Sequence, residues 1–172
     1  MIIREQRTGD QAAVREVILE AFGETKVVDL FDVLAAQGAL SYVAEAGGEV
    51  VGHVALSGSW IDAEPSLVEV LVLSPLSVLP SHQRQGIGGR LVRHAIAAAE
   101  QAGVPALFLE GSPAYYSRFG FQPAAAHGFT KPSVRIPDAA FQVVQLPAHE
   151  PWMTGAFVYR DAFWALDCVG LR

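Results

Sequence analysis

Apolar residues recur every three or four positions in three parts of the chain, which predicts amphipathic helices at residues 11–22, 27–37 and 86–101. Thr8-Gly9-Asp10 precedes the first helix and offers side chains that cap a helix N-terminus. Gly38 ends the second helix, and Gly103 ends the third. A shorter helix is expected at residues 112–118.

Runs of mainly aliphatic residues predict strands, and Gly47-Gly48 between two of them is typical of a hairpin turn. The early strands are expected to pair as antiparallel neighbours, and a strand–helix–strand unit follows them. Together these elements predict an α/β fold with a mixed sheet and helices on its faces. The predicted strands are residues 2–5, 41–45, 49–57, 67–79, 106–110, 141–146 and 155–159.

The composition narrows the class of protein. Apolar residues make up 51% of the 172 residues and charged residues 17%, which indicates a folded globular chain, expected as one domain over residues 1–172. A formal net charge of −6 argues against a general nucleic-acid binder. Charged residues close to residue 1 and the lack of a long apolar run indicate that neither a leader nor a membrane span is expected. A cytoplasmic location is therefore expected. The histidines and the single cysteine, Cys168, show no metal-ligand spacing, so no metal is expected.

A glycine-containing loop follows the predicted strand that ends at Leu79. Glycines there open the helix at residues 86–101, where the first backbone N–H groups have no intrahelical partner. Such a helix end binds anions, and glycine lets a phosphate approach the amides. Arg84, Arg90 and Arg93 add positive charge on an acidic chain. The loop therefore predicts a phosphorylated cofactor, the alternative being a helix start that needs glycine only for packing.

Spacing separates three phosphate-binding motifs. No G-x-x-x-x-G-K-[ST] run exists in the chain. The dinucleotide fingerprint G-x-G-x-x-G fails at Leu91, although Glu110 lies about 20 residues on, where that fingerprint has an acidic residue. The pattern Q/R-x-x-G-x-G/A is matched in full by Gln83, Gly86 and Gly88.

A second segment supports this third motif. Residues 114–121 read Ala-Tyr-Tyr-Ser-Arg-Phe-Gly-Phe and follow another predicted strand. With both motifs in this order, residues 1–122 resemble the GNAT superfamily of acyl-CoA-dependent N-acetyltransferases, and the wording of the second motif resembles the YhbS-like branch. The resemblance implies a GNAT-like fold with a mixed, mostly antiparallel sheet, and acetyl-CoA as co-substrate.

The resemblance also implies where acetyl-CoA binds. Relatives carry a bulge in the fourth strand, and Pro75 removes a ladder N–H near that position. The backbone of Leu76, Ser77 and Val78 would then meet the pantetheine arm, and Ser112 would stand in for a pantetheine-binding asparagine that this chain lacks. The pyrophosphate would lie on the loop formed by Gln83, Arg84, Gln85, Gly86, Ile87, Gly88 and Gly89.

The implied reaction is direct attack of a primary amine on the thioester, with no covalent enzyme intermediate. Tyr116 occupies the tyrosine position of the family pattern and is the candidate general acid, which would also bring it to the cofactor. Glu69, an isolated acid in an apolar strand, is the candidate general base, although strand alternation equally allows a solvated face. Weaker candidates are His53, Glu24 and Asp62, and a water relay is a further alternative.

Three functions compete at this stage. The first is an N-acetyltransferase acting on a small-molecule or peptide amine. The second is a non-catalytic acyl-CoA-binding sensor or regulatory domain, and the third is a nucleotide-binding module. No nucleic-acid or membrane partner is expected, and a homodimer is an open possibility. Neither the amine, nor the acyl-chain preference, nor the oligomeric state can be read from the sequence.

Overall fold

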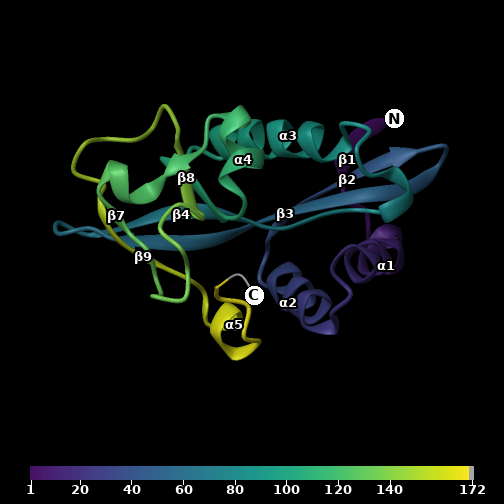
Figure 1. Ribbon diagram of the computed structural model, residues 1–172, viewed down its shortest axis with the longest axis horizontal. Coiled ribbons are helices and arrows are strands. Elements are labelled where there is room, and N and C mark those ends of the chain that lie inside the picture. The colour runs from purple at the N-terminus through teal and green to yellow at the C-terminus, as the bar shows by residue number, and fades with distance from the viewer. Residues whose placement is uncertain (171–172) are drawn as a thin grey trace. The chain divides into compact units, whose positions relative to one another are not determined.

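The computed structural model describes residues 1–170 (Figure 1). The chain forms two compact units. The first unit contains residues 1–57 and 73–97, and the second contains residues 58–72 and the chain from residue 98 onward. Three elements contribute residues to both units: β3 (Glu49–Asp62), β4 (Leu67–Val78) and α3 (Ile87–Gln101).

The first unit starts as an antiparallel meander. β1 (Ile2–Glu5) pairs with β2 (Leu40–Ala46), which pairs with the first half of β3. The hairpin predicted at Gly47-Gly48 is confirmed, because both glycines have positive φ, 60° and 87°, as a two-residue turn of the mirror-image type needs. Helices α1 (Gln11–Phe22) and α2 (Thr25–Ala36) are placed between β1 and β2 in the chain.

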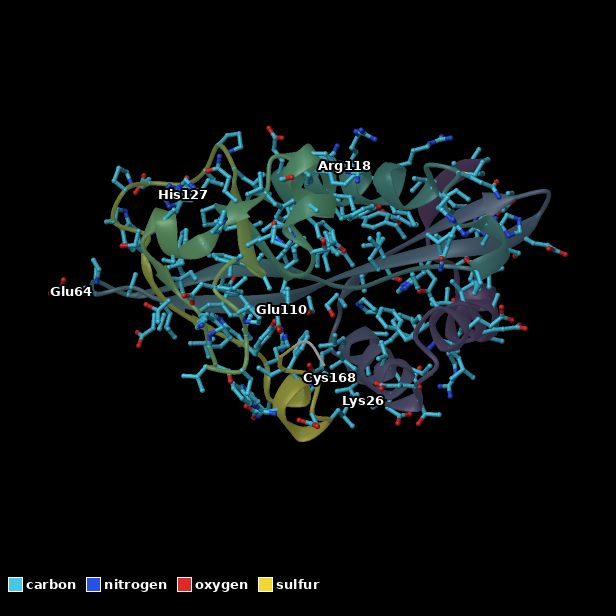
Figure 2. All side chains as sticks on the ribbon, viewed as in Figure 1. Lys26, Glu64, Glu110, Arg118, His127 and Cys168 are labelled. Carbon is cyan, nitrogen blue, oxygen red and sulfur yellow. The ribbon has the colours of Figure 1, made fainter. Side chains whose placement is uncertain are left out.

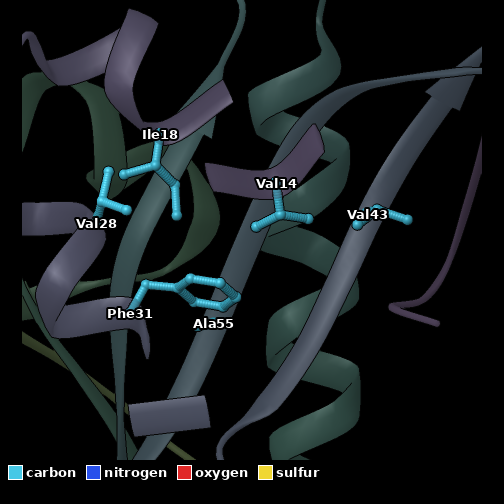
Figure 3. Close-up of a cluster of buried hydrophobic side chains, with 6 residues drawn as sticks. All are labelled: Val14, Ile18, Val28, Phe31, Val43 and Ala55. Carbon is cyan, nitrogen blue, oxygen red and sulfur yellow. The ribbon is translucent and has the colours of Figure 1, made fainter. Parts of the chain in front are cut away.

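Both faces of this meander are covered. α1 and α2 pack on one face around a buried cluster drawn in Figure 3. α3 packs on the other face, where a Cβ on Gly52 would lie 3.1 Å from Leu91 and 3.2 Å from Ile87. Glycine at position 52 therefore lets the helix approach the strand closely. The cluster on the first face consists of Val14, Ile18, Val28, Phe31, Val43 and Ala55.

The start of α1 differs from the expectation. Residues Thr8–Asp10 form a 3-10 turn, and the Asp10 side chain does not cap the helix. Its carboxylate instead accepts the Arg7 backbone N–H at 2.6 Å and pairs with the Arg4 guanidinium at 2.6 Å. The hydrogen bonds from Arg4 lower the pKa of Asp10 to about 2.

The second unit is a mixed set of strands. The start of β4 pairs in parallel with β5 (Ala106–Glu110), which pairs antiparallel with β8 (Phe141–Gln145), and β8 pairs with β6 (Gln122–Pro123). The end of β3 pairs with β9 (Gly155–Val158), which lies parallel to β7 (Phe129–Thr130). Short helices α4 (Pro113–Tyr116) and α5 (Asp161–Ala165) complete the unit.

Aromatic rings fill the core of the second unit. Phe108 of β5 stacks on Phe141 of β8 with ring centroids 5.6 Å apart, and Phe157 of β9 contacts both. Tyr159, directly after β9, stacks on Phe163 of α5 at 4.3 Å. This packing connects the late strands and α5 to the end of β5.

The fold class is confirmed: the sheet is mixed and mostly antiparallel, with parallel pairs at β4–β5 and β7–β9, and helices flank it. Two predictions of extent were wrong. The strand expected to end at Ser57 continues to Asp62, and residues 112–118 form α4 followed by a 3-10 turn at Ser117–Phe119. Within residues 1–170, no helix is both long and apolar enough to cross a membrane.

Candidate functional site

The loop before α3 leaves backbone amides free. Arg84 and Gly86 both adopt positive φ, 60° and 83°, and turn the chain sharply into the helix. The side-chain amides of Gln83 and Gln85 donate back to the Val78 and Ser81 carbonyls at 3.1 and 3.3 Å. These side chains fasten the loop, while the N–H groups of the first helical turn lack intrahelical partners.

The helix start is open for a ligand. The first helical bond runs from the Arg90 N–H to the Gly86 carbonyl at 3.1 Å, which places Ile87, Gly88 and Gly89 in the free first turn. A Cβ added at Gly86 would meet no atom within 4 Å. The glycine is therefore needed for its backbone conformation and for access, and a packing requirement does not explain it.

The burial pattern along β4 changes phase at its middle. Val68, Val70 and Val72 are buried, and then Leu73 is buried directly after Val72. From there the buried positions include Pro75 and Ser77, whereas Leu76 and Val78 are half-buried. The shift lies between Val72 and Leu73, just before the Ser74–Pro75 peptide bond, which is cis.

Two further observations concern β4. Its parallel ladder with β5 consists of Leu71–Leu107 and Val72–Phe108. The Ser77 hydroxyl is buried and has no hydrogen-bond partner within the described residues. An unpaired buried hydroxyl is costly, and a bound polar group would satisfy it.

Tyr116 packs directly on the backbone of Gly111. A Cβ added at Gly111 would lie 2.4 Å from Cε2 of the Tyr116 ring, so any other residue at 111 would collide with the ring. Gly111 is itself fixed, since its N–H donates to the Ala140 carbonyl at 2.9 Å and its carbonyl accepts the Gln142 side-chain amide at 3.1 Å. Burial raises the pKa of Tyr116, so the phenol keeps its proton at neutral pH.

The neighbouring residues take other roles. The Arg118 guanidinium lies over the Tyr115 ring, 4.9 Å from its centroid. Ser112 is exposed, and its carbonyl accepts the N–H groups of Tyr115 and Tyr116 at 3.1 and 3.0 Å. The Ser112 backbone therefore holds the start of α4.

The candidate bases lie in different environments. Glu69 is exposed on β4, between the buried Val68 and Val70, so its side chain is on the solvated face. His53 is fully buried; its Nε2 lies 2.8 Å from the Ser41 hydroxyl, and its Nδ1 has no partner within residues 1–170. Burial lowers the pKa of His53 to about 3, so its ring is neutral at physiological pH.

Glu110 is a half-buried acid at the end of β5 (Figure 2). Its Oε2 accepts the Tyr159 hydroxyl at 2.5 Å, and its Oε1 accepts the Gly170 N–H at 3.0 Å. Burial raises its pKa, and these two hydrogen bonds oppose that rise. The only signal in the sequence is a carboxylate that ends an aliphatic strand immediately before Gly111.

No cluster of three or more His, Cys, Asp and Glu side chains that could hold a metal ion occurs in the described part of the chain.

Comparisons with known proteins find a matching family. Residues 37–123 match the family model described as an acetyltransferase (GNAT) domain. YjhQ of Escherichia coli K12, an uncharacterized N-acetyltransferase, is 34% identical over 154 residues, which cover 85% of this chain and 84% of YjhQ.

Two solved structures are similar along nearly the whole chain. The Escherichia coli GNAT family N-acetyltransferase YhbS in complex with CoA superposes with a TM-score of 0.84 at 27% identity, covering 94% of this chain and 91% of YhbS. A GNAT family acetyltransferase from Brucella melitensis in complex with acetyl-CoA superposes with a TM-score of 0.76 at 35% identity, covering 94% of this chain and 97% of that one.

Proposed function

The chain belongs to the GNAT family of acetyltransferases, and we propose that it moves the acetyl group of acetyl-CoA to a primary amine by direct attack on the thioester. The observation that carries the proposal is the α3 N-terminus, where Gly86 at φ 83° presents unpaired amides to open space. This arrangement suits a pyrophosphate, and the relatives solved with CoA and acetyl-CoA support the assignment.

The residues present fit acetyl-CoA. Its pyrophosphate would bind the amides of Ile87, Gly88 and Gly89, with Arg84 beside them. The half-buried stretch of β4 around the unpaired Ser77 hydroxyl would receive the pantetheine arm. When bound, acetyl-CoA supplies an acetyl group activated as a thioester. The protein brings that group and the amine together, which converts a bimolecular step into an effectively unimolecular one.

Tyr116 is the proposed general acid. Its ring is held on Gly111, and its phenol stays protonated because burial raises its pKa. The hydroxyl is thus in the state that donates a hydrogen bond or a proton to the departing sulfur. Glu69 stays a sequence-based prediction for the base, and its exposed position on β4 would require the amine to approach from the solvated face.

Thermal melting with acetyl-CoA, NAD and ATP tests the cofactor. The Gly86→Glu variant is compared with Gly103→Glu, because both glycines flank α3, have positive φ (83° and 74°) and have no atom within 4 Å of an added Cβ. The two variants therefore share the backbone strain, and Gly86→Glu alone blocks the amides.

Of the three ligands, we expect only acetyl-CoA to raise Tm. The rise should occur in the wild type and in Gly103→Glu, and it should be absent in Gly86→Glu. No shift in the wild type contradicts the proposal. A shift without thiol release for any amine in a broad panel would instead indicate an acyl-CoA-binding sensor.

A further inference from the structure

We infer that Asp32 of α2 fixes the proton of the buried His53 on its Nε2 atom, and that the bare Nδ1 atom then receives the hydroxyl proton of Ser77 on β4. A chain of hydrogen bonds joins Asp32 to His53 within the first unit, to which Ser77 also belongs. Asp32 and His53 are then positioning residues, because they make Ser77 a hydrogen-bond acceptor toward a ligand beside β4. This consequence for a ligand rests on the proposed acetyl-CoA site.

Four hydrogen bonds run in series from α2 to β3. The Gln11 side-chain amide donates to Asp32 Oδ1 at 3.1 Å, and the Gln6 side-chain amide donates to Gln11 Oε1 at 2.8 Å. The Ser41 hydroxyl lies 2.5 Å from Gln6 Oε1 and 2.8 Å from His53 Nε2. Residues of α1, α2, β2 and β3 are thus joined by side chains alone.

The carboxylate at the start gives this chain a single direction. An ionised carboxylate only accepts hydrogen bonds, so Gln11 must turn its NH2 group to Asp32 and its carbonyl oxygen to Gln6. Gln6 therefore presents its own carbonyl oxygen to Ser41, and the single hydroxyl proton of Ser41 is used there. Ser41 has no second proton, so at its other contact it accepts a hydrogen bond from His53 Nε2.

Nδ1 of His53 is consequently a bare nitrogen in the interior. Burial lowers the pKa of His53 to about 3, so the ring is neutral and carries one proton, which the chain places on Nε2. Phe31 packs edge-on against the ring with centroids 4.8 Å apart, and Nδ1 has no partner within residues 1–170. A buried acceptor without a partner is costly, so a nearby donor stabilises it.

Ser77 is the donor that strand register brings to His53. β3 and β4 are neighbours in the sheet, and a short connection joins them, as it joins antiparallel strands. The Leu79 N–H donates to the Val51 carbonyl at 2.9 Å, so two residues further along each strand Ser77 lies opposite His53 on the same face. A Cβ on Gly52 would lie 3.3 Å from the Ser77 carbonyl oxygen, which agrees with this register. The buried Ser77 hydroxyl lacks a partner among the described residues and can supply a proton to Nδ1, directly or through one water molecule.

The direction of the chain decides what Ser77 can do for a ligand. A hydroxyl whose proton is used on Nδ1 can only accept a further hydrogen bond. A ligand beside β4 would then meet Ser77 with an N–H group, and the amides of a pantetheine arm have such groups. If the chain ran in the opposite direction, Nδ1 would donate to Ser77, and the hydroxyl proton would be free to point at the ligand instead.

The test reverses the chain with one substitution. Arg15 donates to Asp32 Oδ2, so in Asp32→Asn it should hold the amide oxygen and turn the NH2 group toward Gln11. Gln11 must then present its oxygen, and every later hydrogen bond reverses. Arg15→Gln is the matched control, because it removes the ion pair and keeps the carboxylate. Nitrogen-15 NMR of histidine-labelled protein shows which ring nitrogen carries the proton, and His53→Gln identifies the resonances of His53.

We expect the proton on Nε2 in the wild type and in Arg15→Gln, and on Nδ1 in Asp32→Asn. Titration calorimetry then measures the binding of acetyl-CoA to the same proteins and to Ser77→Ala. The Kd should rise about 5-fold in Asp32→Asn and in Ser77→Ala, as loss of one hydrogen bond produces, and it should not change in Arg15→Gln.

Each contrary result has a distinct meaning. A proton on Nδ1 in the wild type, which needs no variant to fold, overturns the inference, and so does an unchanged tautomer in Asp32→Asn. A reversed tautomer with an unchanged Kd overturns the role of Ser77 toward the ligand. Wild-type protein that does not bind acetyl-CoA overturns the proposed function and that role with it, while the NMR result still decides where His53 carries its proton.

Discussion

Tyr116 is placed by a residue that has no side chain. Its ring occupies the space that a Cβ on Gly111 would need. Gly111 is held in place because its N–H donates to the Ala140 carbonyl and its carbonyl accepts the Gln142 side-chain amide. At the scale of single residues, the proposed site therefore depends on the lack of a side chain at Gly111 as much as on the proposed reacting groups.

Replacing this glycine tests the dependence. Gly111→Ala places a methyl group 2.4 Å from Tyr116 Cε2, so the ring must move. We expect kcat to fall about 100-fold, as displacement of a reacting group by an ångström can do. The Tm shift with acetyl-CoA should persist. Gly9→Ala is the control, because its added Cβ meets no atom within 4 Å. Unchanged kcat in Gly111→Ala would show that the phenol position does not matter.

His53 gives a prediction about acid stability. In the unfolded chain the His53 ring has a pKa of 6.5, whereas in the folded protein its pKa is about 3. The folded state thus loses stability as pH falls from 6.5 toward 3, by about 1 kcal/mol per pH unit from this group. Urea unfolding from pH 7 to pH 4 measures it. The free energy of unfolding of His53→Gln should depend less steeply on pH. An equally steep dependence would show that other groups cause the effect.

The candidate site residues were predictable to different degrees. Tyr116 and the Gly86 loop lie in short linear motifs, so their spacing in the sequence was enough to select them as candidates. Glu110 accepts hydrogen bonds from Tyr159 and Gly170, which are 49 and 60 positions away in the chain. No local pattern reports such a contact. Glu69 stays a sequence-based prediction for the base.

At the scale of elements, the strands and helices before Phe121 follow their hydrophobic periods closely, and the strand at β5 and the helix at α1 have the predicted bounds. The second half of β3 does not, because Ser57-Gly58-Ser59 has the composition of a turn. β9 pairs with Trp60, Ile61 and Asp62 directly after this stretch, and Arg160 donates to the Gly58 carbonyl at 3.0 Å. α5 was missed because five residues are too few to show a helical period.

The β3–β9 ladder predicts unequal effects for two glycines. Gly155 has φ 142°, and a Cβ there would lie 2.2 Å from the Asp62 carbonyl oxygen, a backbone atom. Gly155→Ala should cost about 3 kcal/mol and lower Tm by roughly 10 °C. At Gly58 the nearest atom, at 3.0 Å, is the end of the flexible Arg160 side chain. Gly58→Ala should cost less than about 1 kcal/mol. Calorimetry measures the loss of stability in both variants. Equal losses would contradict the difference between the surroundings of Gly155 and Gly58.

At the scale of the whole molecule, the prediction of one domain means that the chain should unfold in a single cooperative transition. The chain forms two compact units, yet β3, β4 and α3 each supply residues to both without a break. A strand or helix is not readily cut at its middle, because its hydrogen bonds form a continuous ladder. We therefore expect one folding transition.

The tryptophans make this testable. Trp60, Trp152 and Trp164 all belong to the second unit, whereas α1 and α2 belong to the first. Tryptophan fluorescence therefore reports one unit, and circular dichroism at 222 nm includes the other. The two urea unfolding curves should coincide. Separate midpoints would show two folding domains and contradict the single-domain prediction.

The C-terminal segment has a practical use in identifying the acceptor. Gly170 donates its N–H to Glu110, and the single cysteine of the chain, Cys168, lies two residues before it (Figure 2). An environment-sensitive dye on that thiol would report on the surroundings of the end of β5, which leads into the segment that carries Tyr116. Metabolite fractions could then be ranked by the change in dye emission, so the natural acceptor can be sought without knowing in advance what product to detect.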